Sequence, residues 1–79
     1  MIKVIIKTNT IRDKQVTAEV TDKVISVFED LGVDVSGSTT NLNGTILSNT
    51  DLNASFQANG VEDGETVRLN SVVKLDGGK

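Results

Sequence analysis

The sequence contains no cysteine and no histidine among its 79 residues. Without cysteine, the chain has no disulfide to supplement its core, and no thiolate nucleophile or thiolate metal ligand. Without histidine, it has no imidazole to act as a general base near pH 7 or to bind zinc through nitrogen. A chain this short also offers little volume for a pocket that excludes water. We therefore expect a protein that is not an enzyme and that holds no metal and no cofactor.

Positive charge and aromatic side chains are also scarce. Eight Lys and Arg residues stand against eleven Asp and Glu, which gives a formal net charge of −3 at pH 7. Phosphate binding relies on an excess of basic residues. The only aromatic residues, Phe28 and Phe56, fit core positions and leave no platform for stacking bases. We therefore expect no nucleic-acid partner.

Long apolar runs are missing as well. The first ten residues, MIKVIIKTNT, carry Lys3 and Lys7 inside their apolar stretch, which is typical neither of a signal peptide nor of a membrane span. We therefore expect a cytoplasmic protein with no membrane partner. A chain of this length makes one domain, which we assign to residues 1–75, with residues 76–79 as a flexible C-terminal tail.

What the chain does have is clear alternation near its N-terminus. The stretches 1–8 (MIKVIIKT) and 14–20 (KQVTAEV) each predict a strand with one buried and one solvent-exposed face. A polar loop joins the two strands as a hairpin. The residues predicted to point inward are Ile2, Val4, Ile6, Val16, Ala18 and Val20.

The next stretch, TDKVISVFEDLG at 21–32, changes to a helical period. Its apolar residues recur at i, i+3, i+4 and i+7, which is one stripe of an α-helix. We expect Thr21 or Asp22 to cap the start of this helix and Gly32 to close its end in the left-handed conformation. The stripe comprises Val24, Val27, Phe28 and Leu31.

The polar centre of the chain predicts a hairpin followed by a short helix. Asn43-Gly44 favours a type I′ turn, because both central positions of that turn need positive φ. Leu52 and Phe56, four apart, then indicate one or two helical turns that end at Gly60. The expected caps of that helix are Thr50 and Asp51, and EDGE at 62–65 reads as a turn.

The last predicted strand is TVRLNSVVKL, residues 66–75. Alternation divides its side chains between two faces. The inward set is Val67, Leu69, Ser71 and Val73, and the outward set is Arg68, Asn70, Val72 and Lys74. The element order is therefore β-β-α-β-β-(short helix)-β, with one helix packed across a mixed sheet of four to five strands, which predicts an α+β domain of two layers.

Four stretches in this order resemble ubiquitin and its β-grasp relatives: MIKVIIKT, AEVTD, NGTILSNTDLNASFQANGV and GETVRLNSVVKLDGG. The resemblance implies a β-grasp fold in which the first and last strands run parallel and adjacent at the centre of the sheet. Ser71 would then be a small polar residue among apolar neighbours, hydrogen-bonded locally or at the sheet end. The chain departs from the family at Asn41, where the best-known binding surface carries an exposed aliphatic. The receptors that bind that aliphatic residue in the family are therefore not expected to bind this chain.

The Gly77-Gly78 pair near the C-terminus resembles the tails of sulfur carriers and protein modifiers. In those proteins an adenylating enzyme activates the carboxylate of the last glycine. Here Lys79 follows Gly78, and Asp76 replaces a common basic residue, so activation would require trimming. The simpler interpretation, which we favour, is a polar terminus without a reaction of its own.

The outward residues of the first and last strands form a candidate docking surface. If the two strands are neighbours, four basic residues surround two aliphatics, which suits an acidic protein partner, and we expect the chain to be monomeric. We call this set the basic sheet face: Lys3, Ile5, Lys7, Arg68, Asn70, Val72 and Lys74. The alternatives are a solvated sheet face without a partner, a carrier or modifier activated at Gly78, and a phage or mobile-element protein that keeps only the fold.

Overall fold

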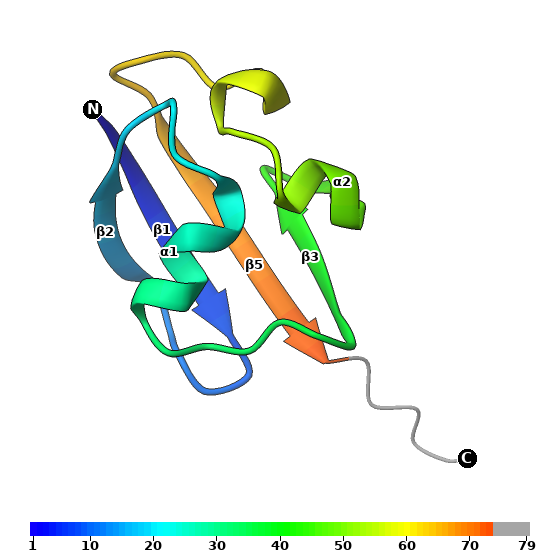
Figure 1. The fold of residues 1–79 in the computed structure, drawn as a ribbon. Helices are drawn as coiled ribbons and strands as arrows, with labels where there is room; N and C mark the ends of the chain where they lie inside the picture. Colours follow the sequence, from blue (N-terminus) through cyan, green and yellow to red (C-terminus); the bar gives the residue numbers. More distant parts are fainter. Residues whose placement is uncertain (74–79) are drawn as a thin grey trace.

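The computed structural model describes residues 1–73, so the predicted tail and Lys74 lie outside the described part of the chain. Its elements follow the predicted order (Figure 1). They are β1 (Ile2–Thr8), β2 (Lys14–Ala18), α1 (Val24–Asp30), β3 (Ser38–Leu42), β4 (Thr45–Ile46), α2 (Asn49–Leu52), the 3₁₀ turn η1 (Gln57–Asn59) and β5 (Thr66–Val73).

The five strands form one mixed sheet in the order β2-β1-β5-β3-β4. β1 and β5, which are farthest apart in sequence, are parallel neighbours at the centre of the sheet, with Val4 opposite Val67 and Ile6 opposite Leu69. The remaining pairs are antiparallel. The expected parallel pairing of the first and last strands is therefore confirmed, and the α+β class with it.

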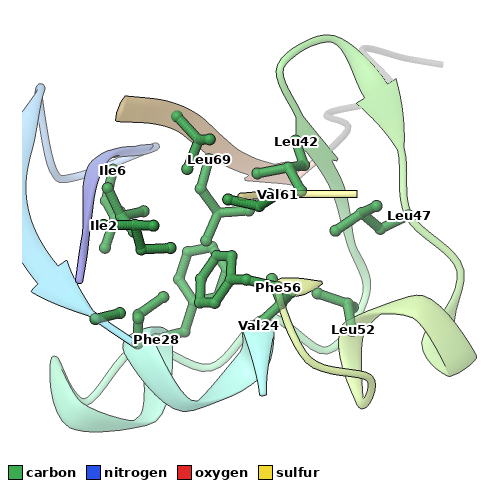
Figure 2. Packing of buried hydrophobic residues seen from close by; sticks show 14 residues of the cluster. Ile2, Ile6, Val24, Phe28, Leu42, Leu47, Leu52, Phe56, Val61 and Leu69 are labelled. Atoms are coloured by element: carbon green, nitrogen blue, oxygen red, sulfur yellow. The ribbon is translucent and has the colours of Figure 1, made fainter. Parts of the chain in front are cut away.

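α1 lies across one face of the sheet, and the core fills the space between them (Figures 1 and 2). The alternation predicted from sequence is confirmed in β1, where Ile2, Val4 and Ile6 are buried. Phe28 from α1 and Phe56 from the segment after α2 are fully buried in the same cluster. Burial of apolar surface at about 25 cal/mol per Å² is the main force holding these elements together.

One predicted inward residue of β5 is not buried. Val73 is 47% exposed, whereas Val67, Leu69 and Ser71 on the same face are all buried. Val73 is the last residue of β5 and pairs with Ser38, the first residue of β3, so it lies where the sheet ends.

The predicted caps of α1 are right at one end and wrong at the other. The N-cap is Lys23, without a side-chain hydrogen bond. The carboxylate of Asp22 instead accepts from the backbone N–H of Glu19, in the turn that precedes the helix. At the other end Gly32 has φ of +71°, and the N–H groups of Gly32 and Val33 donate to the carbonyls of Glu29 and Phe28. This is the Schellman pattern that a glycine at this position favours.

The hairpin turn at Asn43-Gly44 is confirmed, since both residues have positive φ. The helix caps after it are not as predicted. Ser48, rather than Thr50, is the N-cap of α2: its hydroxyl accepts from the N–H of Asp51, and the Asp51 side chain accepts from the N–H of Ser48. This reciprocal capping box satisfies two N–H groups that the first turn of a helix leaves free. α2 then ends at Leu52, and only the separate turn η1 closes at Gly60.

Ser71 is a buried polar residue among apolar neighbours, as the resemblance implied, but its hydrogen-bond partner is neither local nor at the end of the sheet. Its Oγ lies 3.0 Å from Oγ1 of Thr40, and both residues are 2% exposed. The two hydroxyls hydrogen-bond to each other between the adjacent strands β3 and β5, so neither is left unsatisfied in the core.

Candidate functional site

The face of the sheet opposite α1 carries the outward side chains of β1 and β5. Because the two strands are parallel, their outward residues meet in pairs: Ile5 lies opposite Arg68, and Lys7 lies opposite Asn70. Lys3 precedes them on β1, and Val72 follows them on β5. The structure thus brings together all of the predicted basic sheet face except Lys74, which lies outside the described residues.

The basic side chains of this face are exposed to solvent, whereas its aliphatic side chains are only partly exposed. Lys3, Lys7 and Arg68 are exposed, and Val72 is 39% exposed. Ile5 is half-buried, because it lies between its cross-strand neighbours Gln15 and Arg68. The apolar patch that the sequence predicted from Ile5 and Val72 is therefore narrower than expected.

One acidic residue reaches this face that the sequence did not place there. Asp13 sits in the turn before β2 with φ of +48°, and its Oδ1 lies 3.6 Å from Nη1 of Arg68. Both side chains are well exposed, so the ion pair is worth no more than about 1 kcal/mol. Within residues 1–73, Lys3 and Lys7 form no ion pair.

Several other acidic residues are held by local hydrogen bonds away from the outward residues of β1 and β5. Asp34 accepts from the hydroxyl of Ser36 at 2.7 Å and from its backbone N–H at 2.9 Å, and these two bonds lower the pKa of the carboxyl. Asp63 accepts from the α-ammonium group of Met1, which lowers the pKa of Asp63 and raises that of the ammonium group. Glu29 and Asp30 are exposed on α1, which packs on the opposite face of the sheet.

The face extends past β5 onto β3 and β4, which the predicted basic sheet face did not include. Asn41 of β3 lies opposite Asn70, and Ile46 of β4 lies opposite Asn41. Paired residues point to the same face, so Ile46 lies on the face opposite α1, which we call the outer face, and is 69% exposed there. Two-residue β4 shows no alternation of its own. The turn at Asn43-Gly44 could have predicted this position of Ile46, because a two-residue turn fixes which residues of the two strands pair, and it pairs Ile46 with Asn41.

The outer face suits contact with another surface better than enclosure of a small ligand. A hollow of about 380 Å³ lies over other elements and is lined by Val20, Gln57, Gly60, Val61, Glu62 and Asp63. Among residues 1–73, no group of three or more acidic side chains is placed to hold a metal ion. A broad face with exposed cations and aliphatics offers charge attraction and apolar burial, which are the two contributions that protein interfaces combine.

No protein-family model matches the chain, and no curated protein matches it. None of the helices in the described part of the chain is long and apolar enough to cross a membrane.

Proposed function

We propose that this chain is a small ubiquitin-like protein of the β-grasp fold that performs no catalysis and binds an acidic protein surface through its basic sheet face. One observation carries the proposal. In a chain of net charge −3, the parallel pairing of β1 with β5 gathers three exposed cations, Lys3, Lys7 and Arg68, on one face of the sheet.

The β-grasp part of the proposal is supported by the connection between the two central strands. A hairpin of β1 and β2 leads into α1, which crosses one face of the sheet, and β5 returns beside β1 in the same direction. This arrangement, together with the four stretches that resemble ubiquitin, favours the family over an unrelated α+β fold.

The proposed binding of an acidic partner is supported by the exposed charges and aliphatic side chains of this face. Exposed charges at an interface attract an oppositely charged surface and raise the association rate more than they raise the final affinity. Lys3 and Lys7 are available for that role because neither is neutralised among the described residues. Val72 and half-buried Ile5 supply the apolar area that becomes buried on contact.

The test is a charge reversal on the face with a matched reversal elsewhere. A photo-crosslinking residue at Asn70 would first identify the partner in cells. The double variant Lys7→Glu, Arg68→Glu should then bind the purified partner at least about tenfold more weakly, mainly through slower association. The control Lys14→Glu, Lys23→Glu makes the same change of net charge at positions outside the basic sheet face, and should bind normally.

Equal binding by both double variants would contradict the proposal. A cytoplasmic location belongs to the same proposal, and fractionation of the native cells with an antibody to the chain would check it.

The alternative function, activation as a carrier or modifier at Gly78, concerns residues outside the described part of the chain. Deleting Gly77 and Gly78 separates the two functions: a docking module keeps its partner, whereas an activated tail loses all function. An intact-mass spectrum of protein from its native cells provides a second test. A chain that ends at Gly78, or one that carries extra sulfur, would favour activation.

A further inference from the structure

Four neighbouring strands of the sheet, β1, β5, β3 and β4, each contribute one outward side chain to a single row across the outer face. Lys7 on β1 lies opposite Asn70 on β5, Asn70 lies opposite Asn41 on β3, and Asn41 lies opposite Ile46 on β4. We call these four residues the cross-strand row. Neighbouring strands are about 4.8 Å apart, so three spacings separate the ends of the row by roughly 14 Å.

The two ends of the row differ in chemistry. At the β1 end, Lys7 is exposed and forms no ion pair within the described residues, whereas the nearby Arg68 is already in contact with Asp13. At the β4 end, Ile46 is 69% exposed, the highest exposure among the large aliphatic residues of the described chain. A carboxylate is the natural partner of the first end, and an aliphatic side chain is the natural partner of the second.

The middle of the row consists of two amides. Asn41 and Asn70 are half-buried and directly opposite each other, and each amide offers one acceptor and two donors. Among residues 1–73, the side chain of Asn70 makes no hydrogen bond, and that of Asn41 makes only a long one, accepting from the N–H of Gly44 at 3.3 Å. Groups that both donate and accept suit the N–H and C=O groups of a peptide backbone.

We propose that the cross-strand row binds an extended acidic peptide segment of a partner protein, with a carboxylate over Lys7 and an aliphatic side chain, four residues further along, over Ile46. The segment runs across the strands, and its backbone meets Asn70 and Asn41. This inference rests on the proposed function, because Lys7 and Asn70 of the row belong to the basic sheet face and the inference names the kind of segment that binds there.

The spacing of four residues follows from backbone geometry. An extended chain advances about 3.3 Å per residue, so four residues cover roughly 13 Å, close to the width of the row. Side chains four apart in an extended segment also point to the same side, so both can face the sheet. The same four residues in a helix advance only about 6 Å and cannot reach from Lys7 to Ile46.

Two synthetic peptides of equal composition provide the probe. The matched nonapeptide carries glutamate at its third position and leucine at its seventh, with serine and threonine elsewhere and both ends blocked. The shifted peptide has the leucine at its sixth position, so that an extended chain would point it away from the sheet. Titration of isotope-labelled protein by NMR should shift the amide signals of Lys7, Asn70, Asn41 and Ile46, and the shifted peptide should bind about tenfold more weakly.

Variants of β4 test the Ile46 end of the row. Ile46→Thr keeps a β-branched residue in the strand and should reduce binding of the matched peptide to the level of the shifted one. Thr45→Ser, the control on the same strand, should leave binding unchanged. Equal affinity of the two peptides, no binding by either, or full binding by Ile46→Thr would each overturn the inference. The proposed function would survive those results if Lys7→Glu, Arg68→Glu still weakened binding of the partner, and it would fail separately if that variant bound normally.

Discussion

Single side chains decide how the polar groups of this small core are satisfied. Thr40 and Ser71 are buried on adjacent strands, and each is the hydrogen-bond partner of the other's hydroxyl. Asp34 and Ser36 make a similar local pair in the exposed loop before β3. The identity of each residue alone does not show which hydroxyl or carboxylate will be its partner. Strand register pairs Thr40 with Ser71, and the loop conformation pairs Asp34 with Ser36.

Ser71→Ala should destabilise the protein by about 1–3 kcal/mol, because it leaves the Thr40 hydroxyl buried without a partner. Urea unfolding followed by circular dichroism measures this free energy. The double variant Thr40→Val, Ser71→Ala removes both hydroxyls and should recover much of the loss. A double variant no more stable than Ser71→Ala would show that the hydrogen bond does not account for the effect.

Ser36→Ala should raise the pKa of Asp34 towards its usual value of 3.8, because the Ser36 hydroxyl is the main cause that lowers it. A carboxyl with a lowered pKa in the folded state adds stability above its unfolded-state pKa and loses it as the pH falls through the folded-state pKa. The advantage of the wild-type protein over Ser36→Ala should therefore be present at neutral pH and shrink in acid. NMR titration of the Asp34 side chain measures the shift, and an unchanged pKa would contradict this account.

At the scale of elements, short sequence signals decide where each helix and turn begins and ends. α2 has four residues, too few to be stable alone, and its capping box at Ser48 and Asp51 supplies hydrogen bonds that its own backbone lacks. α1 starts instead from Lys23 without a side-chain cap, and the N–H of Val24 donates to the carbonyl of Ala54 at 3.0 Å. The start of α1 is thus held by the segment that follows α2, whereas α2 is capped by its own side chains.

Ser48→Ala should destabilise the protein by about 1 kcal/mol, the usual cost of losing an N-cap side chain. Thr50→Ala, at the position that the sequence suggested as a cap, is the matched control and should change stability by no more than about 0.5 kcal/mol. Thermal unfolding of both variants measures the difference. Equal destabilisation by the two would show that the capping box does not contribute.

The strands, the helix stripe and the turns were predictable because each depends on a local pattern. Alternation identified the buried face of β1, the helical period identified Val24, Val27 and Phe28, and Asn43-Gly44 identified its turn. The features that the sequence did not predict depend on contacts between residues distant in sequence or on loop geometry. Asp13 reaches Arg68 because of a positive φ before β2, and Ile46 joins the outer face through a strand too short to show a pattern.

Across the whole molecule, charge is unevenly distributed even though the net charge is modest. Lys3, Lys7 and Arg68 lie on the outer face, whereas Glu29 and Asp30 lie on α1 on the other side of the sheet. Exposed charges of this kind act over about 10 Å at 0.1 M salt, so they affect how a partner approaches more than how the protein folds.

Asp13→Asn should strengthen binding of an acidic partner, because it removes the negative charge nearest Arg68 and leaves the guanidinium free. The gain should appear mainly in the association rate and should fade as salt is raised from 0.05 to roughly 0.5 M, where screening shortens the range of the field. Surface plasmon resonance at several salt concentrations measures both. A gain that is independent of salt would contradict an electrostatic origin.

The central position of β5 also has a consequence for synthesis of the chain. β1 leaves the ribosome before the other four strands of the sheet, yet one of its two neighbours, β5, leaves after all of them. A nascent chain that lacks residues 66–73 has a gap between β1 and β3, with the apolar side of β1 only partly covered. The native sheet can therefore be completed only after residue 73 has been translated, and a ribosome stalled near residue 60 should hold a chain without this sheet that chaperones bind.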